Sequence, residues 1–110
     1  MELFFTRTYE RAIKKLVSKE SREAMETTIA ADPIGAPIIR GTGGIRKFRW
    51  PGSGRGKRGG IRTLYFYHAS AKAIYLLTAY AKASREEMTS ADRKILARLV
   101  ATIKKEEVKK

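Results

Sequence analysis

The sequence predicts an α+β domain with a small antiparallel sheet of about four strands, two N-terminal helices and a C-terminal helix. Apolar residues recur at three- and four-residue spacing near both ends of the chain, which indicates amphipathic helices. The middle is rich in β-branched and aromatic runs joined by short glycine-containing links, which indicates strands. Strands grouped in this way favour an antiparallel sheet with the helices packed on one face. At 110 residues, we expect 1–110 to be one domain.

The first third of the chain predicts a strand followed by two helices. Residues 2–6 are short and apolar, as in a strand. The stripe of the first helix consists of Tyr9, Ala12, Ile13, Leu16 and Val17. Residues 18–31 continue as a second helix with Ser21 as a candidate cap. Residues 32–33 end it, because a residue that precedes proline is pushed out of the helical region.

The middle of the chain predicts a connector and then three strands. Residues 33–44 contain two prolines and four glycines, and form a connector that includes a short strand at residues 38–39. The strands are residues 45–50, 61–68 and 73–80. In the strand at residues 45–50, side chains alternate between the two faces of the sheet. One face receives Ile45, Lys47 and Arg49, and the other receives Arg46, Phe48 and Trp50.

The end of the chain predicts a helix. Thr89 or Ser90 begins it, and Asp92 lies at the spacing of a capping box with Thr89. One apolar stripe follows, made of Ile95, Leu96, Leu99, Val100 and Ile103. We expect the last seven residues, KKEEVKK, to be frayed.

The charge is concentrated in the middle of the chain. Residues 33–85 contain no Asp or Glu, and their basic side chains contribute about +11 of the total +13. The eleven are Arg40, Arg46, Lys47, Arg49, Arg55, Lys57, Arg58, Arg62, Lys72, Lys82 and Arg85. Cations gathered in this way repel one another, so the usual explanation is a polyanionic partner, most often nucleic acid.

Composition excludes several classes of protein. The chain has no cysteine and one histidine, which excludes disulfides and makes a structural zinc site very improbable. No apolar run approaches the roughly 20 residues that span a bilayer, and the N-terminus lacks the pattern of a secretory signal. We therefore expect a cytoplasmic protein. The acids form no close pair beside the basic block, so a metal-dependent nuclease would lack its ligands, and we expect no cofactor.

The segment PGSGRGKRGG, residues 51–60, reads as a loop that grips phosphate. GRGKRG formally matches a dinucleotide-binding pattern, but a strand follows it where that site needs a helix. A phosphate-binding P-loop also fails, because Pro51 replaces its first glycine and Arg58 its Ser or Thr. Glycines let backbone approach a phosphate, and Arg55, Lys57 and Arg58 can reach around it. The alternative is a solvated hairpin loop without a ligand.

The stretch GTGGIRKFRWPGSGRGKRGGIRTLYFY, followed by AIYLLTAYAKASREEMT, resembles the RelE/ParE superfamily of bacterial type II toxins, in particular its HigB-like members. The match spans residues 41 to about 90, and the strand and helices outside it agree with the β-α-α-β-β-β-α order of that fold. The resemblance implies a ribosome-dependent endoribonuclease that cuts mRNA and is silenced by an antitoxin. The RNA 2′-hydroxyl would attack the neighbouring phosphate, which requires a base, cations around the phosphorane and an acid, but no metal.

The resemblance also implies roles for individual residues. Lys47 matches the position of a catalytic side chain and is our candidate general base, with Arg49 next to it on the same face. Arg62 matches the arginine that stabilises the transition state, and Lys82 matches a basic position beside the scissile phosphate. The residues expected to bind RNA are Arg46, Arg55, Lys57, Arg58, Tyr80 and Arg85. Some relatives carry a late tyrosine as acid or stacking group, whereas no tyrosine follows Tyr80 here, so Tyr80 or His68 would have to replace it.

Two other functions stay open. One is a toxin of the same fold that poisons DNA gyrase without cleaving RNA. The other is a non-catalytic basic module that binds RNA or DNA with a strong salt dependence. Cations converging on two strands favour the nuclease. The expected partners are the ribosome, mRNA and an acidic antitoxin. The HigB-like match implies that the antitoxin has a helix-turn-helix domain, and that the toxin is linked to operator DNA only through this antitoxin.

Overall fold

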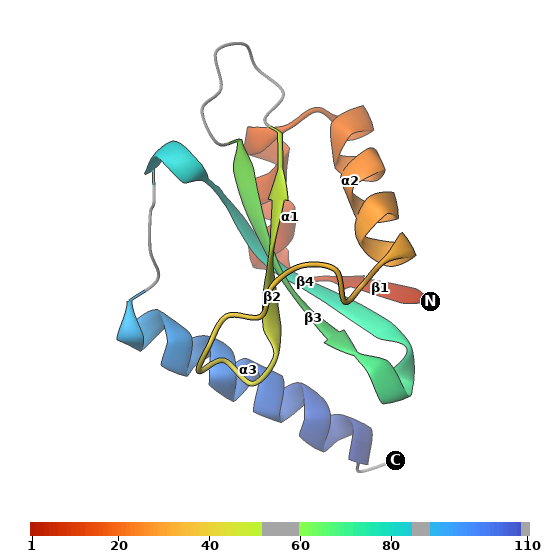
Figure 1. The fold of residues 1–110 in the computed structure, drawn as a ribbon, viewed down its shortest axis with the longest axis vertical. Coiled ribbons are helices and arrows are strands. Elements are labelled where there is room, and N and C mark those ends of the chain that lie inside the picture. The colour runs from red at the N-terminus through yellow and green to blue at the C-terminus, as the bar shows by residue number, and fades with distance from the viewer. Residues whose placement is uncertain (52–59, 85–88, 109–110) are drawn as a thin grey trace.

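The structure is a computed structural model that describes residues 1–51, 60–84 and 89–108. Four strands form one sheet: β1 (Glu2–Phe5), β2 (Ile45–Trp50), β3 (Ile61–His68) and β4 (Ala73–Ala81). Their order across the sheet is β1-β4-β3-β2 (Figure 1). The predicted α+β class, the four strands and the three helices are confirmed.

The expectation of a wholly antiparallel sheet is wrong at one edge. β2 pairs with β3 and β3 with β4 in antiparallel registers, but β1 pairs with β4 in a parallel one, Glu2 opposite Ala73 and Phe5 opposite Leu76. Parallel neighbours need a long crossover connection, and here two helices and two further strands separate β1 from β4 in the chain.

The two N-terminal helices begin at side-chain caps. The backbone N–H of Tyr9 donates to Thr6 Oγ1 at 3.1 Å, and α1 (Arg7–Leu16) starts there. The N–H of Ser21 donates to Ser18 Oγ at 3.1 Å at the start of α2 (Lys19–Ala31), so Ser18 caps this helix and the prediction of Ser21 is wrong. Ser21 has another task, because its hydroxyl oxygen accepts the indole N–H of Trp50 at 3.0 Å.

Helices cover both faces of the sheet, in contrast to the predicted single face. α1 and α2 pack on one face in a cluster that includes Tyr9, Ile13, Met25, Tyr65 and Leu76. α3 (Ser90–Val108) packs on the other face, where Val100 joins Ile45, Leu64, Phe66 and Leu77 (Figure 1). The physical reason is that β3 and β4 carry apolar residues on both faces, so a helix layer on one face alone would leave the other exposed.

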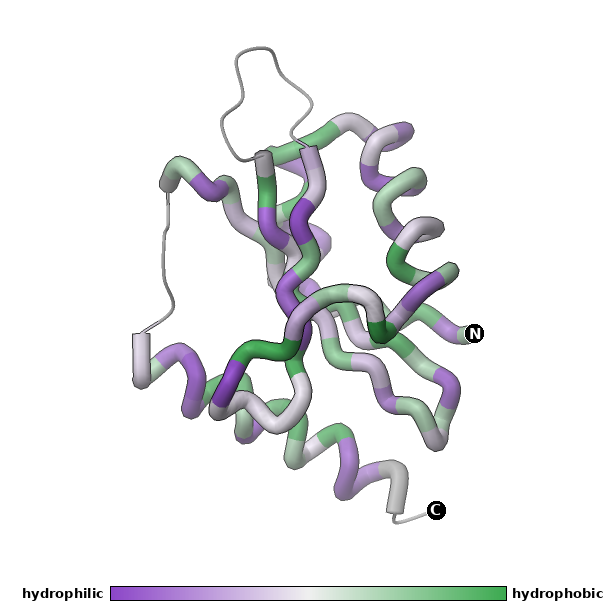
Figure 2. The backbone as a smooth tube through the Cα atoms, viewed as in Figure 1, coloured by the Kyte–Doolittle hydropathy of each residue, from purple (hydrophilic) through white to green (hydrophobic). Residues whose placement is uncertain are grey.

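The last helix docks through a narrow stripe. Val100 is 2% exposed, whereas Ile95 is 62% exposed, so the predicted stripe is only partly buried. A reciprocal capping box starts α3: the Asp92 N–H donates to Thr89 Oγ1 at 3.1 Å and the Thr89 N–H to Asp92 Oδ2 at 3.2 Å. The helix continues to Val108, further than the frayed end that we expected. Figure 2 shows hydrophobic and hydrophilic residues alternating along this helix.

The connector before β2 covers the outer edge of that strand. Backbone bonds run from the Ile39 N–H to the Ile45 carbonyl at 2.7 Å and from the Lys47 N–H to the Pro37 carbonyl at 2.9 Å. A single bridge, Ile38 with Arg46, stands where we expected a short strand. The outer edge of β2 is therefore held by the connector.

A buried polar network joins α1 to α2. The Tyr9 hydroxyl donates to Glu26 Oε2 at 2.7 Å, and the same oxygen accepts the Arg22 Nε–H at 2.7 Å. Arg22 also pairs with Glu10 at 2.8 Å, and its guanidinium lies 5.1 Å from the ring centre of Phe5. The carboxylates of Glu10 and Glu26 are thus both engaged with Arg22.

Among the described helices, none is long and apolar enough to cross a membrane.

Candidate functional site

Three of the predicted cations and one tyrosine share a single face of the sheet. In the strand register Lys47 lies opposite Leu64, Arg49 lies opposite Arg62, and Arg62 lies opposite Tyr80. Ile45 and Leu64 belong to the cluster under α3, so alternation puts these four side chains on the α3 face, beyond the apolar part that α3 covers. Neighbouring strands are about 4.8 Å apart and alternate residues about 7 Å apart. The four side chains can therefore reach one phosphate group.

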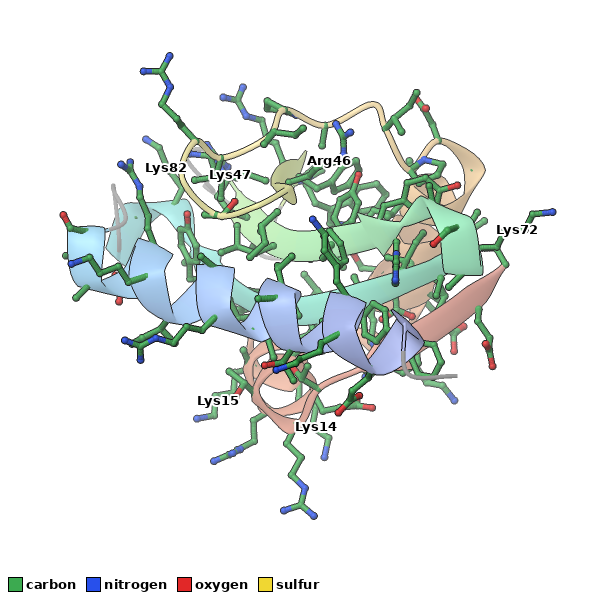
Figure 3. The ribbon with its side chains drawn as sticks, turned by 90° about the horizontal axis from the view of Figure 1, so that it is seen from below. Lys14, Lys15, Arg46, Lys47, Lys72 and Lys82 are labelled. Atoms are coloured by element: carbon green, nitrogen blue, oxygen red, sulfur yellow. The ribbon has the colours of Figure 1, made fainter. Side chains whose placement is uncertain are left out.

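Lys82 joins this group from the end of β4. It begins the short 3₁₀ helix η2 (Lys82–Ser84), and its backbone N–H donates to the Gly60 carbonyl at 3.0 Å. Gly60 precedes β3, so Lys82 lies beside the strand end that carries Arg62. Figure 3 shows Lys47 and Lys82 near the same end of the sheet and Lys72 at the opposite end.

The environment of the site is strongly positive. Arg62 is 5% exposed, and its Nη1 donates to the Ile61 carbonyl at 3.2 Å. Lys47, Tyr80 and Lys82 are half-buried, and Arg49 is exposed. Because β2, β3 and β4 contain no Asp or Glu, an approaching phosphate meets the cations of β2, β3 and η2 without an acid on these strands to neutralise them. The arrangement is suited to stabilising added negative charge on a phosphate.

The structure does not bring Arg46 to this group. Arg46 lies on the opposite face of β2 from Lys47 and Arg49, on the same face as Phe48 and Trp50. Its Nη1 donates to the Ala36 carbonyl at 2.7 Å and to the Ile34 carbonyl at 3.1 Å. These bonds tie β2 to the connector, so the guanidinium has a structural task away from the other predicted site residues.

His68 is also distant from the group. It ends β3, pairs with Ala73 and lies six residues from Arg62, about 20 Å along the strand. Its ring is 5.7 Å from that of Phe66, which belongs to the cluster under α3. Of the two residues that the sequence offered in place of a late tyrosine, the structure brings Tyr80 to the site.

Four predicted residues lie outside the part of the chain that the structure describes: Arg55, Lys57, Arg58 and Arg85. The phosphate-gripping loop is therefore not described. The strand ends that flank it are, with Trp50 opposite Ile61 in the register.

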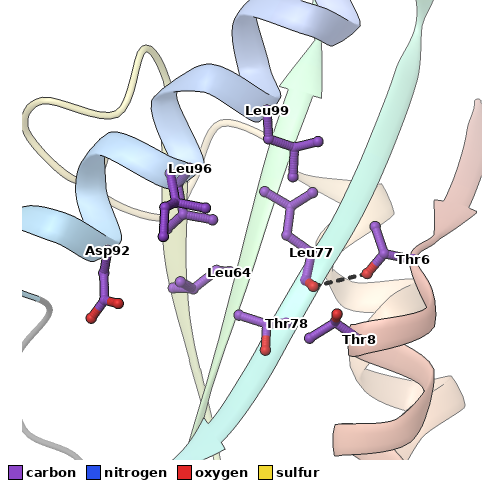
Figure 4. Close-up of a pocket in the computed structure, with 9 residues that line it drawn as sticks. Thr6, Thr8, Leu64, Leu77, Thr78, Asp92, Leu96 and Leu99 are labelled. Atoms are coloured by element: carbon purple, nitrogen blue, oxygen red, sulfur yellow. Dashed lines mark hydrogen bonds between the residues drawn. The ribbon is translucent and has the colours of Figure 1, made fainter.

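A cavity of about 290 Å³ adjoins the cations on the same face, between α3, the sheet and the start of α1 (Figure 4). It is lined by Thr6, Thr8, Leu64, Leu77, Thr78, Asp92, Ile95, Leu96 and Leu99. Leu64 and Thr78 belong to the same register row as Lys47. No local pattern in the sequence marks these residues as a set, because α1, β4 and α3 meet here only through tertiary packing.

The described residues contain no group of three His, Cys, Asp or Glu side chains that could hold a metal ion.

Comparisons with known proteins agree with the fold described above. Residues 1–110 match the family model described as "RelE toxin of RelE / RelB toxin-antitoxin system". The intact E. coli RelBE toxin–antitoxin complex contains a similar chain, with 18% identity, a TM-score of 0.52, and coverage of 71% of this chain and 92% of that one. A double arginine-to-alanine mutant of E. coli toxin RelE in the free state has 21% identity, a TM-score of 0.51, and coverage of 77% and 86%. These structures share the fold, and the family model over the whole length shows that the chain belongs to the RelE toxin family.

Proposed function

We propose that this RelE-family toxin is a ribosome-dependent endoribonuclease that cuts mRNA during translation without a metal ion. The observation that carries the proposal is the register row Arg49–Arg62–Tyr80, with Lys47 one alternate position away on the same face. Cations from three adjacent elements can surround one phosphate, and no acid occurs in residues 33–85 to neutralise them.

The positions of these groups match the needs of the reaction. The neutral amine form of Lys47 takes the proton of the RNA 2′-hydroxyl, and that oxygen attacks the adjacent phosphorus. Arg62, on the central strand, and Arg49 stabilise the charge that builds up on the phosphorane oxygens. The bond from phosphorus to the 5′-oxygen then breaks, and Tyr80 protonates the leaving oxygen. The products are a 2′,3′-cyclic phosphate and a 5′-hydroxyl. Lys47 has gained one proton and Tyr80 has lost one.

Strand order supports placing the base and the acid in this way. Lys47 lies on β2 and Tyr80 on β4, on opposite sides of Arg62 on β3. The two strands that flank β3 are about 10 Å apart, a span that a lysine and a tyrosine side chain can close over one phosphate. Attacking and leaving oxygens lie roughly in line in a phosphoryl displacement, so a base and an acid are needed on opposite sides of phosphorus.

The test is a cell-free translation reaction followed by primer extension on the mRNA. Wild type is expected to produce cuts at ribosome-bound codons, and Arg62→Ala to cut about 10²- to 10³-fold more slowly, the usual cost of losing one transition-state donor. Arg62→Lys keeps the positive charge and serves as a second variant in case Arg62→Ala does not fold. Arg40→Ala, which removes an exposed arginine of the connector, is the matched control. Folding of each variant is checked by circular dichroism.

Two outcomes would overturn the proposal. A folded Arg62→Ala protein that cuts as fast as wild type would show that the site is wrong. A wild-type protein that leaves translation intact but blocks DNA supercoiling by gyrase would favour the gyrase-poisoning alternative.

We further propose that an antitoxin neutralises the protein. RelE forms such a complex in the solved E. coli RelBE assembly. The net charge of +13 favours an acidic antitoxin segment, and the HigB-like sequence match favours a helix-turn-helix protein that alone contacts operator DNA. Electrostatic steering predicts an association rate that falls as salt rises, more than the final affinity does. Stopped-flow mixing measures this, and an association rate insensitive to salt would contradict it.

A further inference from the structure

We infer that the exposed face of α1 binds the sugar–phosphate backbone of an RNA helix, as a second RNA-binding surface separate from the candidate site. Four exposed cations form it, and together we name them the α1 basic face: Arg7, Arg11, Lys14 and Lys15. At 100° per residue they occupy an arc of about 100° on the helix. The opposite side of the helix carries buried Tyr9 and Ile13, which fix this arc toward solvent.

The α1 basic face lies away from the proposed reaction centre. Figure 3 shows Lys14 and Lys15 projecting from one side of the molecule, whereas Lys47 and Lys82 lie on the opposite side, beyond the sheet. The α1 basic face also lies outside residues 33–85, the acid-free block that the proposed function explains. A phosphate bound at Lys47 therefore leaves these four cations without a role.

The charge of the α1 basic face is not balanced by its neighbours on the helix. Glu10 is the acid of α1, and its carboxylate is bound to Arg22 at 2.8 Å. The exposed side of α2 is different, because Lys19 is followed there by Glu20 and Glu23. Solvated surfaces usually intersperse both signs, as α2 does. The single sign on α1 calls for an anionic ligand.

The shape of the surface fits a polyanion that runs along the helix. Arg7, Arg11 and Lys15 follow one another every four residues, about 6 Å apart along the axis. Two hollows flank this row. One, of about 270 Å³, is lined by Thr8, Arg11, Ala12 and Lys15. The other, of about 310 Å³, includes Lys14 and Lys19 in its lining. A repeating anion can thus meet several cations in register along one ridge.

The composition of the α1 basic face selects among anionic partners. A helix that lies in a membrane surface exposes an apolar face beside its cations, whereas the apolar side of α1 is buried against the sheet and α2. Protein interfaces have a core that is depleted of charged residues, with lysine depleted overall. Long cations alone are typical of sequence-independent binding to phosphates. Because the inference builds on the proposed function, in which the protein works on the ribosome, the partner is RNA.

The experiment measures binding without any cleavage, so it stands apart from a test of the proposed function. The probe is a fluorescein-labelled RNA duplex of about 16 base pairs. Its 2′-hydroxyls are methylated so that it cannot be cut. The test variant is Arg11→Gln/Lys14→Gln/Lys15→Gln. The matched control is Lys72→Gln/Lys94→Gln/Lys105→Gln, which removes three exposed cations from scattered places. Both variants have a net charge of +10 in place of +13.

Anisotropy titrations between ~50 and ~200 mM salt give the slope of log affinity against log salt. The test variant should lower that slope by about three, one for each cation that no longer meets a phosphate, while the control stays close to wild type. A test variant with the slope of wild type would overturn the inference, as would equal losses in both triple variants. Loss of binding to phosphatidylserine–phosphatidylcholine vesicles with duplex binding intact would also overturn it, in favour of a lipid surface.

Discussion

Replacing Arg46 by methionine separates a structural arginine from the cations of the proposed site. The side chain of Arg46 donates from Nη1 to the carbonyls of Ala36 and Ile34, at 2.7 and 3.1 Å. Methionine keeps most of the aliphatic stem but removes Nη1, the donor atom of both bonds. The expected result is a less stable protein whose folded fraction still cuts RNA at the wild-type rate.

The size of the effect follows from the burial of the two acceptors. Ala36 is 7% exposed, so water replaces the lost partner of its carbonyl poorly, whereas Ile34 is 64% exposed and its carbonyl is more easily rehydrated. A hydrogen bond from a charged donor contributes about 1.5–3 kcal/mol. One effective bond and one weak bond therefore give a loss of about 2 kcal/mol in the free energy of unfolding. With a urea m-value of about 1–3 kcal/mol/M, the midpoint should fall by about 1 M.

Fluorescence of Trp50 during urea unfolding measures this, because it is the one tryptophan of the chain and its indole N–H is bound to Ser21. Arg49→Met is the matched control, three residues along the same strand but exposed and on the other face. Its stability should change by less than about 0.5 kcal/mol while cleavage falls. An Arg46→Met protein as stable as wild type would refute the reasoning, above all if its RNA cleavage were lost.

The network between α1 and α2 leads to two further predictions. Tyr9→Phe removes the 2.7 Å bond to buried Glu26 and should lower the free energy of unfolding by about 1–3 kcal/mol in the same urea assay, and an unchanged midpoint would contradict this. Burial, followed by the hydrogen bond to Glu26, raises the pKa of Tyr9 above its usual value. The folded state thus keeps a proton that the unfolded state loses above about pH 10, so the Tyr9 contribution is complete below pH 10 and declines above it. Melting temperatures from pH 8 to 11 should therefore fall less steeply in Tyr9→Phe than in wild type, and parallel curves would count against this linkage.

Local patterns predicted correctly which face of the sheet the residues of β2 occupy. Alternation in residues 45–50 separated Lys47 and Arg49 from Arg46, and the structure confirms this because Ile45 packs under α3 while Phe48 and Trp50 pack toward α2. The same alternation did not reveal that Arg46 is bound to the connector, since its acceptors lie ten and twelve residues earlier in the chain. A count of charges treats all cations alike, and only their hydrogen bonds distinguish them.

The sequence by itself determined the types and order of the elements, the charge of the central block and the face on which Lys47 lies, because these depend on periods of two or 3.6 residues and on composition. Only the tertiary structure decided that β1 runs parallel to β4, that α3 covers the second face, and that Arg62 lies between Arg49 and Tyr80 while His68 is about 20 Å away. Each of these depends on pairing between distant segments, and the bulge between Leu64 and Tyr65 shifts the β3–β4 register in a way that no local pattern encodes.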